Sequence, residues 1–173
     1  MGAKNSNKDG KYPSWVGVKT LVYNTKTLKR QNELLYEILS NYSDTPGLEK
    51  VIRELTNKIY HLLERVENKY YYVSKGFIEG EPSIVEHMIP HGVEISIIRE
   101  KIEKKEIKNK EDLLNFVREN YFVCLVSINE NRLLEVNGFM KSMPVKWWED
   151  ETNREGIVMR KPFARYEGLI KIK

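Results

Sequence analysis

The fold is decided by residues 27–67, which read TLKRQNELLYEILSNYSDTPGLEKVIRELTNKIYHLLERVE. Apolar side chains recur in this stretch at steps of three and four residues, in two runs separated by a short polar segment. The first run holds Leu28, Leu34, Leu35, Ile38, Leu39 and Tyr42, and the second holds Leu48, Val51, Ile52, Leu55, Ile59, Leu62, Leu63 and Val66. This period is typical of amphipathic helices, so we expect helices over 27–42 and 45–67.

The start of the second helix and the turn before it can also be predicted. Thr45 is a suitable N-cap, and Pro46 suits the first helical position because a proline lacks the N–H that would be unpaired there. Only Ser43 and Asp44 separate this cap from the first helix, so the two helices must turn back on each other as an antiparallel hairpin. We expect Leu55 and Ile59 at the centre of its core.

The chain after residue 68 mixes strand and helix signals. Strands are expected near 70–74, 84–88 and 121–128, and the last of these is apolar throughout, which predicts cover on both faces. A helical pattern covers 92–107, and a second begins after an Asn109–Asp112 capping pair. A third covers 130–136, with Ser127 or Asn129 as its cap. A last helical turn at 162–166 should lead into an edge strand at 169–172.

These elements predict an α+β fold, in which the N-terminal helical hairpin packs with further helices and a small sheet. A chain of 173 residues can bury a core as one domain, which we place at 12–173. Residues 1–11 are polar, rich in Gly, Asn and Lys and without periodicity, so they predict a disordered basic tail.

Composition excludes several classes of protein. One cysteine and three histidines cannot supply a disulfide framework or a zinc cluster of the Cys₂His₂ kind. The sequence has neither a run of 18 apolar residues nor the apolar segment of a signal peptide. We therefore expect a protein of the cytoplasm with no membrane contact.

Charge is distributed unevenly along the chain. Residues 1–30 carry seven Lys and Arg and one Asp, and residues 154–173 carry six Lys and Arg and two Glu. The 123 residues between them have a net charge of −6. Attraction to a polyanion such as DNA or RNA would therefore come from the two ends. A solvated surface with a loose basic tail is the alternative.

The densest group of titratable side chains is Glu86-His87-Met88-Ile89-Pro90-His91. A helical pair of zinc-binding histidines is disfavoured here, because Pro90 interrupts the helix that His87 and His91 would have to share. Read as the end of a strand, the segment completes the order strand, strand, helix. The alternative is that His87 and His91 are partly buried structural residues beside a proline turn.

In that order, Glu86-His87-Met88-Ile89-Pro90 resembles the opening motif of HNH-type ββα-metal nucleases. The resemblance covers about 35 residues and implies that His87 is the general base that deprotonates water and that Glu86 is a ligand of Mg²⁺ or Mn²⁺. A second carboxylate ligand would come from the following helix, with Glu94 as our choice over Glu100 and Glu103. The chain lacks the second Gly, the mid-loop Asn and the helical His that complete the family pattern.

A second group of candidate residues mixes cations with aromatic rings near the C-terminus. It consists of Lys146, Trp147, Trp148, Arg160, Lys161, Arg165 and Tyr166. Cations can neutralise phosphates while flat rings stack on bases, and the same mixture is typical of protein interfaces. The alternative is that the rings close the core and the cations point outward.

From these observations we expect a nucleic-acid-associated protein of the phage or mobile-element type, with a divergent metal-dependent nuclease as its enzymatic form. The alternative is a non-enzymatic inhibitor or interaction module that binds another protein through a Trp/Arg surface. Cys124 lies within the apolar strand and is expected to be a small buried hydrophobe, not a nucleophile.

Overall fold

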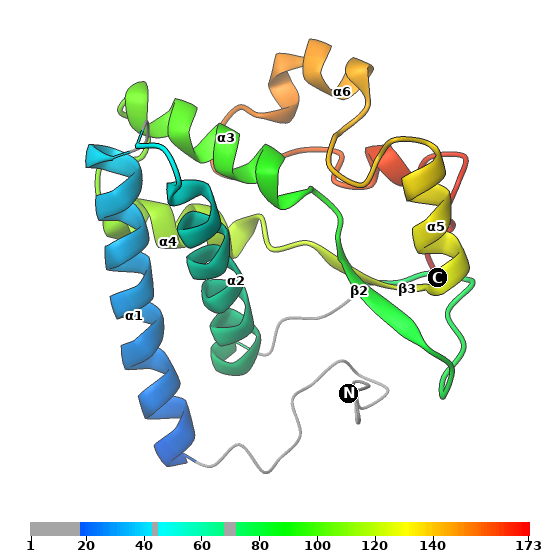
Figure 1. Cartoon of the computed structure of the whole chain (residues 1–173), viewed down its shortest axis with the longest axis horizontal. Coiled ribbons are helices and arrows are strands. Elements are labelled where there is room, and N and C mark those ends of the chain that lie inside the picture. The colour runs from blue at the N-terminus through cyan, green and yellow to red at the C-terminus, as the bar shows by residue number, and fades with distance from the viewer. Residues whose placement is uncertain (1–17, 43–44, 68–71) are drawn as a thin grey trace. The chain divides into compact units, whose positions relative to one another are not determined.

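The structure is a computed structural model that describes residues 18–42, 45–67 and 72–173. It has the predicted α+β composition, and its parts form two compact units (Figure 1). One unit holds the sheet, within residues 72–97 and 119–173, and the other holds the described residues up to 67 together with 98–118. The predicted tail at 1–11 lies outside the described residues, and the single domain at 12–173 stays a prediction.

The helical hairpin is confirmed. Helix α1 (Val18–Asn41) and helix α2 (Leu48–Glu67) run side by side (Figure 1). Leu55 is 5% exposed and Ile59 is fully buried, as the periodicity predicts. The second helix starts later than expected: it begins at Leu48, whose N–H bonds to the carbonyl of Thr45, while Gly47 has a positive φ of 87°. Pro46 therefore lies in the turn and not in the first helical position.

Two further helices follow strand β2 (Ser83–His87) and contribute residues 98–118 to the helical unit. Helix α3 (His91–Glu103) ends earlier than the predicted 107, because Lys105 has a positive φ of 59° and the N–H groups of Glu106 and Ile107 bond back to the Lys101 carbonyl. Helix α4 (Lys110–Glu119) begins as predicted, with the Asp112 N–H donating to Asn109 Oδ1 at 2.9 Å. Its start is tied to α1, since Asn32 Nδ2 donates to the Lys110 carbonyl at 2.5 Å.

The sheet of the other unit has the strand order β1-β3-β2, formed by β1 (Tyr72–Val73), β2 (Ser83–His87) and β3 (Val123–Ser127). Strand β3 is central, parallel to β1 and antiparallel to β2. Four of its five residues are buried, which confirms cover on both faces. Strands β1 and β2 follow each other in the sequence, as the strand-strand-helix order predicts, but β3 lies between them in the sheet.

One face of this sheet carries the core of the unit. Helix α5 (Ile128–Val136) and the C-terminal segment pack on it, and they lie together in Figure 1. The buried side chains of this core are Met88, Cys124, Val126, Leu134, Tyr166 and Ile170. Ser127 caps α5 as predicted, and the helix ends before Gly138, whose φ is 75°.

Shorter elements close the chain. Helix α6 (Val145–Glu149) and the 3-10 turns η1 (Glu151–Asn153) and η2 (Ala164–Tyr166) follow α5, and η2 is the helical turn expected at 162–166. The edge strand expected at 169–172 is reduced to one antiparallel bridge between Ile172 and Ser74. None of the described helices combines the length and the apolar character that crossing a membrane requires.

Candidate functional site

Glu86 is bound by a buried arginine. The Arg165 side chain is fully buried, and its Nη2 donates to Glu86 Oε1, whose side chain is 14% exposed. The same guanidinium donates from Nε to the Met88 carbonyl at 2.9 Å, from Nη1 to the Phe139 carbonyl at 2.6 Å, and from Nη2 to the His87 carbonyl. Arg165 thus links the C-terminal turn η2 to the end of strand β2 by hydrogen bonds, and Glu86 has an ion-pair partner within the protein.

His87 lies on the other face of the strand. Successive side chains of a strand point to opposite faces, so His87 turns away from the face that Glu86 shares with Cys124. Its ring contacts His91 edge-on, with the centroids 4.4 Å apart, and also contacts Tyr121 at 6.0 Å. The structure therefore brings Glu86 to Arg165 and His87 to two aromatic neighbours, and it does not bring the two predicted catalytic residues together.

Glu86 and Glu94, the two predicted metal ligands, are both largely buried, and Glu86 is paired with Arg165. Mg²⁺ is commonly bound by one or two carboxylates, with waters and substrate phosphates as its other ligands. Glu94 is 2% exposed, and burial raises its pKa well above the ordinary value, which favours the uncharged acid. No group of three or more His, Cys, Asp and Glu side chains within the described residues could hold a metal ion. The Mg²⁺ or Mn²⁺ site stays a prediction.

The aromatic residues of the C-terminal group belong mainly to the core. Trp147 is 2% exposed, its Nε1 donates to the Arg160 carbonyl at 2.9 Å, and its ring packs edge-on against the half-buried Trp148. Tyr166 is 1% exposed. Together with Arg165, these residues are used in packing, as in the alternative in which the rings close the core.

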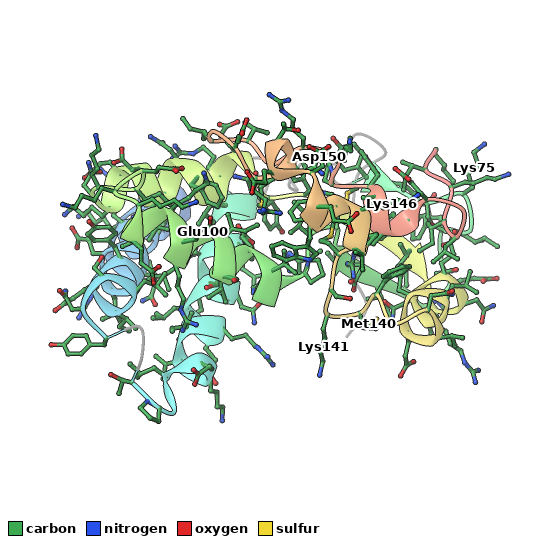
Figure 2. The ribbon with its side chains drawn as sticks, turned by 90° about the horizontal axis from the view of Figure 1, so that it is seen from above. Lys75, Glu100, Met140, Lys141, Lys146 and Asp150 are labelled. Atoms are coloured by element: carbon green, nitrogen blue, oxygen red, sulfur yellow. The ribbon has the colours of Figure 1, made fainter. Side chains whose placement is uncertain are left out.

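The cations of the same group lie among acids. Lys146 and Arg160 are exposed, but Lys161 Nζ pairs with Asp150 at 2.9 Å. The hydrogen bond from Thr152, followed by this ion pair, lowers the pKa of Asp150. Figure 2 labels Lys146 and Asp150 on this part of the ribbon. Residues 145–161 carry four cations and, in Glu149, Asp150, Glu151 and Glu155, four acids, so the segment has no net charge.

Cys124 is not a nucleophile. It is fully buried in the central strand, and burial, followed by the charges of Glu130 and Glu86, raises the pKa of its thiol to about 12. A thiol with this pKa carries almost no thiolate at neutral pH. The interpretation of Cys124 as a small buried hydrophobe is confirmed.

Three lysines that were not in any predicted site do gather at one place. The Lys75 N–H donates to the Lys171 carbonyl at 2.7 Å, and the Lys173 N–H donates to the Val73 carbonyl at 2.8 Å. These two bonds flank the antiparallel bridge between Ser74 and Ile172 and bring Lys75, Lys171 and Lys173 to the same edge of the sheet. We call Lys75, Lys171 and Lys173 the lysine edge.

The lysine edge is exposed, and its lysines form no ion pair with another described residue. All three residues are exposed, and Lys75 projects at the margin of the unit beside the C-terminal ribbon, drawn in red in Figure 2. Lys173 Nζ donates to a neutral group, the Phe77 carbonyl, at 2.9 Å and lies 5.5 Å from the Phe77 ring centroid. None of the ion pairs between described residues uses any of the three. The sequence showed the basic C-terminus, but only the pairing adds Lys75, which lies about 100 positions earlier.

Comparison of the chain with models of protein families, with curated proteins and with solved structures gives no match.

Proposed function

We propose that this protein associates with nucleic acids by binding the phosphate backbone at the lysine edge. The observation that carries the proposal is the pairing of Lys75 with Lys171, which joins three exposed cations from two distant parts of the sequence. Lysines bind phosphates as point charges, and their release of counterions drives binding to any nucleic acid sequence.

The energetics of the edge support an external anion. Like charges directly opposite each other across two strands destabilise the pair. Backbone bonds bring Lys75, Lys171 and Lys173 to one edge of the sheet, where their positive charges repel one another in the same sense. A bound phosphate backbone would turn this repulsion into attraction, whereas a purely structural edge gains nothing from it.

The same geometry argues for backbone contacts and against base recognition. Sequence-specific recognition uses bidentate Arg, Asn or Gln side chains on base edges. The lysine edge holds none of these, and the predicted binding residue Arg165 is buried and occupied. We therefore expect similar affinity for unrelated sequences, with a salt slope of up to about −2.7 from three phosphate contacts.

The test is a salt titration of a labelled duplex DNA and a labelled single-stranded RNA against the wild-type chain and two variants. Lys75→Gln/Lys171→Gln/Lys173→Gln should make the slope of log K against log salt less negative by up to about 2.7, the whole contribution expected from three phosphate contacts. The matched control, Lys146→Gln/Arg160→Gln, removes exposed cations that lie among acids and should change the slope by less. Equal losses in the two variants, or no binding by the wild-type chain at low salt, would refute the proposal.

A protein partner is the second candidate, because α5 exposes three apolar side chains. Ile128, Leu133 and Val136 are 52%, 42% and 76% exposed. Large apolar side chains gathered at a surface favour a protein contact. The discriminating experiment is a pull-down with and without nuclease treatment, repeated with Leu133→Ser/Val136→Ser. A partner that survives the nuclease and is lost with this variant would favour the second candidate.

A further inference from the structure

The carboxylate of Glu130 does more than cap its helix. Glu130 lies in the first turn of α5 and forms a capping box with Ser127, whose N–H and Oγ both donate to Oε2 at 3.0 Å. A capping box needs nothing beyond this pair of residues. The same carboxylate also accepts from Ser74 Oγ at 2.5 Å and from the Gly76 N–H at 3.0 Å.

Those two additional donors flank Lys75. Ser74 is fully buried, and its own N–H donates to the Leu125 carbonyl of β3 at 3.0 Å. The Phe77 N–H donates to the Ser74 carbonyl at 3.3 Å and closes a tight turn, with Lys75 and Gly76 at its centre. Glu130 therefore holds the residue before Lys75 and the residue after it, and Lys75 itself is bonded to Lys171.

The glycine at position 76 points to the same contact. Its φ is not positive, so the backbone conformation does not require glycine. A Cβ at this position would come within 2.5 Å of Glu130 Cδ and within 2.7 Å of both carboxylate oxygens. Such distances are shorter than non-bonded atoms allow, so any larger residue would displace Glu130 from the turn.

We infer that Glu130 is a positioning residue for the lysine edge. It fixes the turn that carries Lys75 so that this lysine stands beside Lys171 and Lys173 when a phosphate backbone binds. Its own negative charge is directed at four donors. The inference rests on the proposed function and adds to it a carboxylate that promotes the binding of an anion.

Electrostatics alone and a positioning role predict opposite changes in affinity when Glu130 loses its charge. Removal of a negative charge from a protein that binds a polyanion strengthens binding when nothing else changes. Positioning predicts the reverse for Glu130→Gln, because the amide cannot accept from four donors with the strength of a carboxylate and the turn at Lys75 loosens. Glu135→Gln is the matched control, since Glu135 is exposed on the same helix and the substitution makes the same change of charge.

The experiment measures DNA affinity and salt slope for Glu130→Gln, Glu135→Gln, Lys75→Gln and the double variant Glu130→Gln/Lys75→Gln. Glu130→Gln should weaken binding and make the slope of log K against log salt less negative by roughly one, as Lys75→Gln does. Glu135→Gln should leave this slope unchanged. In the Lys75→Gln background, Glu130→Gln should cause no further loss, because two residues that act through one contact are not additive. A merely structural role would lower the melting temperature without moving the slope.

Ser74→Ala keeps the test decisive if Glu130→Gln folds poorly. This variant removes one donor to Glu130 and leaves the capping box intact. It should also make the salt slope less negative. If Lys75→Gln weakens binding but neither Glu130→Gln nor Ser74→Ala does so, the positioning role is wrong and the proposed function stands. If Lys75→Gln has no effect on binding, the lysine edge itself is wrong and the positioning role is refuted with it.

Discussion

Arg165 is the residue whose replacement we expect to damage the sheet-containing unit most. Its guanidinium is fully buried and donates to Glu86 and to three carbonyl groups, those of Met88, His87 and Phe139. Arg165→Met retains much of the apolar stem but removes all of these donors. The carboxylate of Glu86 and the three carbonyls would then lose their partner in a region closed to water.

The magnitude follows from the burial of the pair. Removal of one partner from a buried ion pair costs about 3–5 kcal/mol, because the other charge is left without compensation. Glu86 is 14% exposed and can recover some hydration, which places the expected loss for Arg165→Met near the lower limit. Glu86→Gln should cost a similar amount, about 3 kcal/mol, since it leaves the fully buried Arg165 charge without its carboxylate although the three carbonyl acceptors remain.

The assay is urea unfolding followed by tryptophan fluorescence, to which Trp147 and Trp148 in the same unit contribute. A double variant, Glu86→Leu/Arg165→Met, separates the charge effect from loss of packing, since replacing both partners by apolar residues is often neutral or stabilising. We expect the double variant to be more stable than Arg165→Met alone. An Arg165→Met protein that unfolds within about 0.5 kcal/mol of the wild-type chain, the range of ordinary surface substitutions, would refute this account of the pair.

Three other predictions concern the hairpin, a buried acid and the nuclease hypothesis. Leu55→Ala should lower the free energy of unfolding by about 2–5 kcal/mol, as large-to-small core changes do. Val51→Ala, on the exposed face of the same helix, should change it little. Equal effects of the two variants would contradict the packing of the hairpin. Burial raises the pKa of Glu94, so the contribution of this group to stability is fully present below the ordinary value of 4.5 and is lost as the pH rises through the folded-state pKa. Glu94→Gln should flatten that part of the pH profile, and an unchanged profile would contradict the burial of a neutral acid. His87→Ala should lower the melting temperature through the lost contacts with His91 and Tyr121, and cleavage of DNA with Mg²⁺ or Mn²⁺ that disappears in this variant would instead favour the nuclease.

The two-unit arrangement matters for all stability measurements. The helical hairpin and the sheet belong to different compact units, so the two can unfold in separate transitions. Fluorescence from Trp147 and Trp148 reports the sheet-containing unit, whereas Leu55 lies in the helical unit and its variant should be followed by far-UV circular dichroism.

Elements with a local signal were predictable from the amino-acid sequence. The periodicity of 27–67 predicts two helices of opposite direction, and the apolar run around Cys124 predicts the central strand, because each pattern depends only on which face of its own element is apolar. Caps at Ser127 and at Asn109 were predictable for the same reason, since a cap bonds to residues two or three positions along the chain. The start of α2 was not, because the turn at Gly47 moved it past Pro46.

Tertiary structure alone decided which charged and aromatic side chains are available for binding. Arg165 and Trp147 have the composition of a binding surface, but whether such a side chain is buried depends on what packs over it, and that is not encoded in its neighbours in the sequence. The lysine edge arises from backbone pairing between segments about 100 residues apart, and its link to Glu130 arises from bonds to a carboxylate 54 and 56 positions away. Glu86 and His87 separate because adjacent strand residues face opposite sides of the sheet. Contacts of this range are set by the packing of the whole unit and leave no signal in local sequence.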